Sequence, residues 1–343
     1  MLTADAGVSE GSSSEGVFGF QNIVGDSPVL RDALRLAARV AATRRTTVLL
    51  LGETGTGKEL FARGIHYAGA SASEPFVAIN CAAIPENLLE SELFGHERGA
   101  FTGAHSRKQG LLELAGSGSL FLDEVHHLPR QLQPKLLRAL ESRQVRRLGG
   151  LAEFPIECRI ITAASPLLEQ VVAAGEFRED LYYRLNVFSI TLPPLRERMS
   201  DVEIIARHFL GEETRDYQKP KRFSDDAIAA LLVHRWPGNV RELKNVVERA
   251  AILSEESPIV RAEHLMIQRR SVRVASGEEV VGDIRIPRHG KLLEDIEREA
   301  VALTLKITGG NQAAAARMLG ISRPTLAKKM APRHVPAGEP VNQ

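Results

Sequence analysis

The stretch VLLLGETGTGKELFARGIHYAG, residues 48–69, indicates the fold class, because an apolar strand, a glycine-rich loop and a helix follow one another in it. This is the setting that the motif G-x-x-x-x-G-K requires. The glycines let backbone amides face phosphate oxygens, and the dipole of the following helix favours the negative charge. Lys58 would reach the β and γ phosphates. In preference to a plain glycine turn, we expect a phosphate site made of Gly52, Glu53, Thr54, Gly55, Thr56, Gly57, Lys58 and Glu59.

Two adjacent carboxylates end a second apolar strand, in GSLFLDEVHHLP, residues 118–129. At the carboxyl end of a strand, Asp123 can hold Mg²⁺ while Glu124 polarises the attacking water. Alone the pair is a weak signal, but together with the glycine loop it is a strong one. Adjacent histidines are expected to point to different faces, and there is no HExxH motif, so we interpret His126 and His127 as structural or surface residues.

Composition narrows the class of protein. The 343 residues include 44 basic and 43 acidic side chains, so nucleic-acid affinity would require local segregation of charge. Cys81 and Cys158 lack CxxC spacing, which fits a reducing compartment. There is no signal peptide, and no apolar run approaches the roughly 20 residues that span a bilayer. We expect a cytoplasmic protein with no membrane insertion.

Helical and strand patterns alternate along the first part of the chain, beginning with a helix over residues 28–42 and a strand over residues 48–51. The alternation continues to about residue 194 and predicts a largely parallel sheet covered by helices. Residues 201–254 have a purely helical pattern. Residues 268–290 show no sustained period, which is typical of a linker.

Five motifs then point to one family: GETGTGKE, ESELFGHERGAFTGA, GSLFLDEV, FREDLYYRLNVFSITLPPLRER and WPGNVRELKNVVERA. In this order they closely resemble the central AAA+ ATPase domain of bacterial enhancer-binding proteins, which activate sigma-54 RNA polymerase. The resemblance runs from about Ile23 to Ser254. It implies an α/β P-loop ATPase with helices on both faces of a parallel sheet and a helical lid. Most phosphate loops place a Ser or Thr that holds Mg²⁺ at the position of Glu59, but Glu is usual in this family.

The resemblance also implies roles for residues elsewhere, with ATP and Mg²⁺ as cofactors. Asn80 matches an asparagine proposed to switch the catalytic glutamate. Arg178 and Arg184 match arginines presented to a neighbouring subunit's ATP in a ring, which we expect to be a hexamer. A guanidinium supplied in trans would make hydrolysis depend on assembly, although without the resemblance a salt-bridged helix surface would be preferred. Arg241 matches the lid arginine that senses nucleotide.

A glycine-flanked loop lies in HERGAFTGAHS, residues 96–106. Its glycines allow the loop to extend, and its tip offers an apolar contact between polar flanks. In the resembling family this loop engages sigma-54. The alternative is that Phe101 anchors the loop in its own core. We expect sigma-54 contacts from Gly99, Ala100, Phe101, Thr102, Gly103 and Ala104.

The carboxyl-terminal stretch, residues 291–332, divides into three helices at Gly309, Gly310 and Gly320, with Ser322 as the cap of the third. No acidic residue occurs between residues 300 and 334, which is the local segregation of charge that DNA binding needs. The layout resembles a Fis-type helix-turn-helix, with a dimerising hairpin as the alternative. The expected DNA contacts are Arg323, Thr325, Lys328 and Lys329.

The expected organisation is a disordered segment over 1–22, an AAA+ domain over 23–254, a linker over 255–290, an all-α helix-turn-helix domain over 291–332 and a tail over 333–343. Within the AAA+ domain the α/β part ends at about residue 198 and the lid covers 199–254. The segment before residue 23 leaves no room for a receiver domain, so we expect any control to come from a separate regulatory protein or from expression level.

The predicted function is activation of sigma-54 RNA polymerase holoenzyme from enhancer DNA, driven by ATP hydrolysis, in the cytoplasm and at the nucleoid. One departure leaves an alternative open: Ala164 and Ser165 stand where the family usually has a sensor Thr and Asn. A repressor or scaffold with a degenerate ATPase is therefore the second hypothesis. A general AAA+ remodeller or helicase loader is the third, and it should lack GAFTGA.

Overall fold

Five parallel strands form the central sheet in a computed structural model that describes residues 19–215, 220–255, 257–267 and 292–330. Leu51 of strand β1 lies opposite Ala164 on one side and Thr191 on the other. The sheet strands are apolar because both faces are covered, and the predicted parallel sheet is confirmed. In spatial order the strands are β2 (Phe76–Asn80), β5 (Ser119–Asp123), β8 (Arg159–Ala164), β1 (Val48–Leu51) and β9 (Phe188–Thr191).

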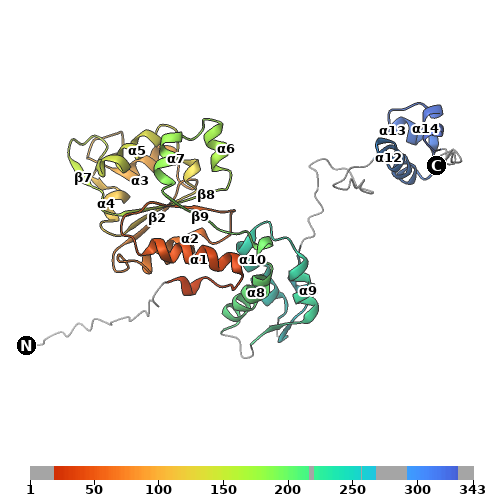
Figure 1. Cartoon of the computed structure of the whole chain (residues 1–343), viewed down its shortest axis with the longest axis horizontal. Coiled ribbons are helices and arrows are strands. Elements are labelled where there is room, and N and C mark those ends of the chain that lie inside the picture. Colours follow the sequence, from red (N-terminus) through yellow and green to blue (C-terminus); the bar gives the residue numbers. More distant parts are fainter. Residues whose placement is uncertain (1–18, 216–219, 256, 268–291, 331–343) are drawn as a thin grey trace, which may run out of the picture. The chain divides into compact units, whose positions relative to one another are not determined.

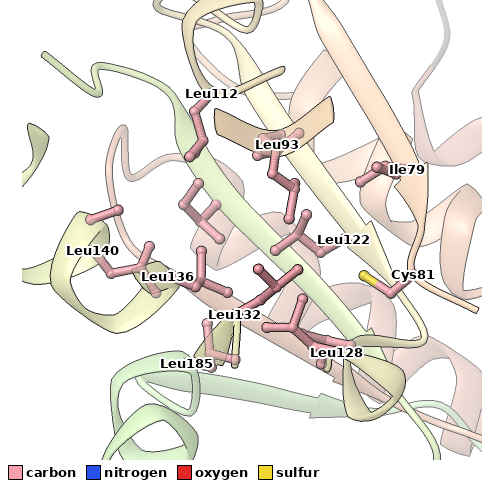
Figure 2. Packing of buried hydrophobic residues seen from close by; sticks show 14 of the residues in the cluster. Ile79, Cys81, Leu93, Leu112, Leu122, Leu128, Leu132, Leu136, Leu140 and Leu185 are labelled. Atoms are coloured by element: carbon pink, nitrogen blue, oxygen red, sulfur yellow. The ribbon is translucent and has the colours of Figure 1, made fainter. Parts of the chain in front are cut away.

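Helices pack on both faces of this sheet, as predicted (Figure 1). On one face, α1 (Pro28–Ala41) and α2 (Lys58–Tyr67) bury side chains such as Leu50 and Phe61. The opposite face holds a larger leucine-rich core, to which Leu122 of the sheet and Leu136 of the helix layer both belong (Figure 2). The helices of that second layer are α3 (Glu86–Phe94), α4 (Leu111–Leu114), α5 (Gln133–Ser142), α6 (Leu168–Ala173) and α7 (Glu179–Leu185).

Two hairpins and three 3-10 turns complete the α/β part. The first hairpin joins β3 (Gly95–His96) to β4 (Lys108–Gln109), and the second joins β6 (Gln144–Arg146) to β7 (Glu153–Pro155). The 3-10 turns are η1 (Phe20–Asn22), η2 (Val125–His127) and η3 (Leu195–Glu197).

Ordered structure begins before the expected boundary at residue 23. Phe20 packs against α2, and its ring would collide with any side chain placed at Gly64. Residues 1–18 of the expected disordered segment lie outside the described residues.

The lid consists of α8 (Ser200–Glu213), α9 (Asp225–Val233) and α10 (Asn239–Leu253) around the fully buried Trp236. It differs from the sequence prediction in two respects. It is not purely helical, because β10 (Arg222–Phe223) pairs with β11 (Ile259–Val260). It also continues past residue 254 through α11 (Ala262–Leu265), and Val260 and Leu265 are completely buried in the lid core. The linker expected from residue 255 therefore starts too early.

A second unit follows, separated from the first after Ile267. Its three helices are α12 (Leu293–Ile307), α13 (Gln312–Met318) and α14 (Arg323–Met330), as predicted. The side-chain oxygen of Asn311 caps α13 by accepting 3.1 Å hydrogen bonds from the amides of Ala313 and Ala314. The expected linker residues 268–290 and tail residues 333–343 lie outside the described part. None of the described helices is long and apolar enough to cross a membrane.

One buried cation joins β8 to the connection between α1 and β1. The Arg159 guanidinium, 4% exposed, donates to the carbonyl oxygens of Val40 (2.8 Å), Thr43 (3.0 Å) and Thr46 (3.1 Å). Burial lowers the pKa of Arg159 to about 10. Its role is to satisfy carbonyl groups that have no strand partner at this end of the sheet.

Replacing Arg159 by Met keeps the apolar stem and removes the guanidinium donor from all three carbonyls, of which that of Val40 still accepts from Thr43. We expect the free energy of unfolding to fall by about 3 kcal/mol, since buried acceptors lose charge-assisted hydrogen bonds. The measurement is urea denaturation of the full chain. Arg39→Met, on the exposed side of α1, is the matched control and should change stability by less than roughly 0.5 kcal/mol. Equal effects of the two substitutions would contradict this role of Arg159.

Candidate functional site: the phosphate loop and the surfaces around it

The phosphate loop lies between β1 and α2, where the sequence predicts it. Gly55 and Gly57 have φ values of 81° and 103°, which few residues other than glycine adopt. A side chain at Gly55 would also collide with the carbonyl oxygen of Gly238, in the lid. The loop therefore needs glycine both for its own curl and for close approach of the lid backbone.

Lys58 begins α2 and points back over the loop. Its ammonium donates to the carbonyl oxygen of Gly52 at 2.9 Å and lies 3.5 Å from Oε1 of Glu124. The Lys58 side chain is only 7% exposed. The fold thus brings together two residues that lie 66 positions apart in the sequence and that were predicted to serve one site.

The carboxylates at the end of β5 sit beside the end of β2. Asp123 pairs in register with Asn80, whose amide donates to Oδ2 of Asp123 at 3.3 Å. Burial, followed by the neighbouring Glu124 charge, raises the pKa of Asp123. Asn80 was expected to act on Glu124, and in this structure its amide contacts Asp123 instead. The oxygen donors of Asp123 and Asn80 fit the ligand preference of Mg²⁺.

His126 and His127 lie closer to this site than expected. They occupy η2, and their ring centroids are 4.3 Å apart, so adjacent positions have not sent the two rings to different faces. Nδ1 of His126 lies 3.5 Å from Oε2 of Glu124. Burial lowers the pKa of His126, followed by the effect of His127. The sequence interpretation missed this grouping because it assumed regular helix or strand geometry, whereas Glu124 adopts a left-handed conformation with φ of 52°.

The lid and the η3 turn before it contact the phosphate loop through residues that sequence reasoning did not select. The completely buried Asn239 donates to Oε2 of Glu53 at 3.2 Å and to the carbonyl oxygen of Thr54 at 3.0 Å. Arg196 forms a bidentate pair with Glu53, both contacts being 2.7 Å, and this pair lowers the pKa of Glu53. The quoted motifs WPGNVREL and LPPLRER contain both residues, but nothing in their local pattern shows which side chains reach the loop.

Arg241, the expected nucleotide sensor, lies next to Gly55 of the phosphate loop. Its Cβ is 3.1 Å from the place where a side chain at Gly55 would begin. A pocket between loop and lid is lined by Ile23, Gly57, Phe209 and other residues of both parts. This pocket is apolar and adjoins the phosphate loop, as a nucleobase site should.

The two arginines of α7 have different surroundings. Arg178 is exposed at the amino end of the helix and pairs with Asp180 at 2.6 Å. Arg184 donates to the carbonyl oxygen of Leu140 at 2.9 Å. Neither of these partners, Asp180 and Leu140, belongs to the phosphate loop of the same chain.

Ala164 and Ser165, which stand where the family usually has a sensor Thr and Asn, lie at the end of β8 and just after it. Ala164 ends β8 and is fully buried, and its carbonyl oxygen accepts from the amide of Gly52 at 3.2 Å. The hydroxyl of Ser165 accepts from the amide of Leu167 at 3.3 Å. In this structure Ser165 therefore caps the turn that follows β8.

The GAFTGA loop rises from the β3–β4 hairpin. Its ends are tied by a 2.9 Å hydrogen bond from the amide of Gly99 to the carbonyl oxygen of Ala104, which is buried. Gly99 and Gly103 have positive φ values, and any side chain there would meet open space. Phe101 is 43% exposed, with its ring edge-to-face on His96 at 5.0 Å. The alternative that Phe101 is anchored in the core is not what the structure has.

One buried arginine forms ion pairs with two glutamates at the base of this loop. Arg147, whose side chain is 2% exposed, contacts Glu97 at 2.8 Å and Glu113 at 2.6 Å. The hydrogen bond to Glu113, and then that to Glu97, raises the pKa of Arg147. Glu97 precedes the loop tip and Glu113 belongs to α4, so one guanidinium joins the loop to the helix layer.

The predicted DNA-contacting residues lie on and around α14. Arg323 and Lys328 are exposed. The hydroxyl of Thr325 lies 2.7 Å from that of Ser322, whose oxygen also accepts from the Thr325 amide at 3.3 Å. Lys329 forms an ion pair with Glu297 of α12. Thr325 and Lys329 are thus engaged within the unit, whereas Arg323 and Lys328 face solvent.

Family models match three consecutive segments of the chain. Residues 23–191 match the Sigma-54 interaction domain, residues 196–279 match the AAA+ ATPase lid domain, and residues 292–331 match the bacterial regulatory protein, Fis family. The lid match extends past residue 254, in agreement with the burial of β11 and α11.

Relatives span the same three segments. The chain is 46% identical to the Nif-specific regulatory protein of Azotobacter vinelandii over 308 residues, which cover 90% of this chain and 58% of that protein. It is 43% identical to the regulatory protein AtoC of Escherichia coli, over 90% of this chain and 67% of that protein. The chain thus spans from just under three fifths to about two thirds of the length of these relatives.

A solved structure agrees with these matches. The crystal structure of NtrX from Brucella abortus in complex with ATP is 34% identical, with a TM-score of 0.65 and coverage of 90% of this chain and 68% of that one. The matches cover the phosphate loop, the lid and the three carboxyl-terminal helices alike. The chain therefore belongs to the family of sigma-54-dependent transcriptional regulators built from an AAA+ ATPase domain, its lid and a Fis-type helix-turn-helix.

Proposed function

We propose that this protein is an ATP-hydrolysing activator that binds enhancer DNA and remodels the closed complex of sigma-54 RNA polymerase. One observation carries the proposal: a phosphate loop with Lys58, Asp123 and Glu124 converging on it occurs in the same domain as an exposed, glycine-flanked Phe101. The first group suits phosphoryl chemistry, and the second suits contact with a protein partner. The setting is the bacterial cytoplasm, where polymerase and DNA are found.

The nucleotide would lie along the loop. Amides of residues 52–58 and the α2 dipole would face its phosphates, and its base would enter the apolar pocket between loop and lid. Lys58, now beside Glu124, would turn to the β and γ phosphates. Asp123 and Asn80 would hold Mg²⁺, which supplies neutralisation of phosphate charge when bound. Glu53 stays with Arg196 and Asn239, and it links the loop to the lid.

Hydrolysis requires a base at the water that attacks the γ phosphorus. The bond from phosphorus to the β–γ bridging oxygen breaks, and the water proton passes to the Glu124 carboxylate, giving ADP and phosphate. Release of Glu124 from Lys58 on nucleotide binding would make this carboxylate available. Asn80, which is hydrogen-bonded to Asp123 one position away, would alter the orientation of Glu124 when the phosphate is lost.

Assembly would complete the site. Arg178 is exposed and held by a single surface pair, so it can exchange Asp180 for a phosphate of a neighbouring copy. Arg184 is tied to the carbonyl oxygen of Leu140 and would position α7 or move with it. We propose a ring of copies, a hexamer, in which hydrolysis at each interface drives the GAFTGA loops. A separate regulatory protein would control assembly.

The carboxyl-terminal unit would hold the ring at an enhancer. Its basic α14 would enter the major groove of DNA, with Arg323 and Lys328 in the leading positions.

A second candidate function is a DNA-binding repressor or scaffold without ATP turnover. The observation that favours it is the presence of Ala164 and Ser165 at the two expected sensor positions. Alanine has no hydroxyl to offer a nucleotide, and the Ser165 hydroxyl already accepts from the Leu167 amide. If the purified chain binds both DNA and ATP but does not hydrolyse ATP, this second function is supported.

Two substitutions separate nucleotide binding from hydrolysis. Lys58→Ala should abolish ATP binding, since it removes the phosphate contact. Glu124→Gln should keep binding and slow hydrolysis by a factor on the order of a hundred or more, because the base is lost while Asp123 remains. Calorimetric ATP titration and phosphate release measure the two steps. Wild-type turnover by Glu124→Gln would place the base elsewhere.

Phe101→Ala should separate hydrolysis from partner binding. The Phe101 ring lies outside the nucleotide site, so ATP turnover should stay within a few-fold of wild type. Capture of sigma-54 in the presence of a transition-state nucleotide mimic should fall at least about tenfold, as expected for loss of a buried aromatic contact. Thr102→Ala should act in the same direction more weakly. Val233→Ala, an exposed apolar residue of α9, is the control and should capture sigma-54 normally.

Substitutions in α14 test the DNA contacts against a matched neighbour. With a duplex selected by the full chain from a random-sequence pool, Lys328→Ala should weaken binding and reduce the salt slope by about one. Arg323→Ala should cost about 1–3 kcal/mol if it reaches a base. Lys329→Ala should have the smaller effect, since its ammonium is engaged by Glu297. A larger loss at Lys329 than at Lys328 would contradict this order.

A further inference from the structure

Three side chains with metal-binding atoms meet at the turn after β5. Glu124, His126 and His127 each offer one ligand atom, and these atoms all lie within 4.8 Å of one another. The turn is closed by a 2.9 Å hydrogen bond from the amide of His127 to the carbonyl oxygen of Glu124. Residues i and i+3 eclipse in a 3-10 turn, so this bond brings His127 over Glu124.

The spacing of two of these atoms suits a tetrahedral metal ion. Oε2 of Glu124 and Nδ1 of His126 are 3.5 Å apart. Two ligands about 2.0–2.2 Å from a tetrahedral Zn²⁺ are separated by roughly 3.4 Å, so this pair needs almost no movement to share an ion. His127 is exposed and can close on the same ion from the solvent side.

A polar atom without a partner points to the same conclusion. Nδ1 of His126 is buried and has no hydrogen-bond partner among the described residues. Buried polar atoms are normally satisfied, and each exception needs an explanation. Oε1 of Glu124 faces Lys58, while Oε2 faces His126, so the two oxygens serve different neighbours.

We propose that Glu124, His126 and His127 bind a divalent first-row transition-metal ion such as Zn²⁺, and that the bound ion arrests ATP hydrolysis by occupying the Glu124 carboxylate. One carboxylate and two imidazoles form a donor set that favours Zn²⁺ over Mg²⁺, with water completing the tetrahedron on the open side. The metal-binding part of the proposal depends only on the positions of these three side chains. The arrest rests on the proposed role of Glu124 as the base.

The first test measures Zn²⁺ binding to the nucleotide-free full chain by calorimetry, with Co²⁺ absorption to report tetrahedral coordination. We expect one ion per chain, and at least a tenfold weaker affinity in His127→Gln and in His126→Gln. Glu124→Gln should also weaken binding, because it removes the anionic ligand. The chain has ten histidines, so His105→Gln, an exposed histidine outside the cluster, controls for surface binding and should leave affinity unchanged.

His127 is exposed, so its variant keeps the fold, and circular dichroism checks this. Undiminished Zn²⁺ affinity in both His127→Gln and the His126→Gln, His127→Gln double variant would overturn the site, as would the lack of tetrahedral Co²⁺ bands in the wild type.

The second test adds Zn²⁺, at concentrations set by the measured affinity, to protein turning over Mg²⁺–ATP. Wild-type turnover should stop, and His127→Gln should need at least tenfold more Zn²⁺ for the same fractional loss. Binding without any loss of turnover would overturn the arrest and leave the site. A wild type with no turnover at all would contradict the proposed function instead, and the binding test would still decide the metal site.

Discussion

The close approach of the lid backbone to the phosphate loop governs how the other parts of the nucleotide site are arranged. Gly55 has no room for a side chain because Gly238 lies against it, and the carbonyl oxygen of Gly55 accepts from the amide of Val240 at 2.9 Å. Asn239 adds side-chain bonds to Glu53 and Thr54 from the same turn. Any change in the shape of the phosphate loop when nucleotide binds or leaves must therefore shift the residues at the start of α10. The lid can thus respond to nucleotide through the loop as well as through the pocket between them.

A second connection runs toward the GAFTGA loop. Arg147 is buried and holds Glu97 at the stem of the GAFTGA loop and Glu113 on α4. Removing one partner of a buried, paired charge is costly, so these groups are expected to move together or not at all. The stem of loop 96–106 is thus fixed to the helix layer, and its tip is flanked by glycines. A loop fixed at its stem suits transmission of force better than a loop free along its whole length.

The parts of the fold that follow from local pattern could be predicted from the sequence. Strand, glycine loop and helix around Lys58 are adjacent in the chain, and parallel strands bring their carboxyl ends together, so the meeting of Lys58 with Glu124 followed. What could not be predicted depends on single backbone angles or very short elements. The left-handed Glu124 turned His126 toward the site, and two-residue strands gave no pattern that would extend the lid to residue 267. The choice of Asp123 over Glu124 by Asn80 is a matter of strand register.

Trp236 is the only tryptophan in the chain, and it is fully buried in the lid, where its indole N–H donates to the carbonyl oxygen of Leu231 at 3.0 Å. The ring of His234 lies edge-to-face on it at 4.6 Å. Its backbone is left-handed, and it stands four residues before Val240, whose amide donates to the carbonyl oxygen of Gly55. Intrinsic fluorescence excited at the indole band therefore comes from one place, next to the junction of lid and loop. The molecule carries its own optical reporter of lid movement, and no dye or engineered label is needed to follow it.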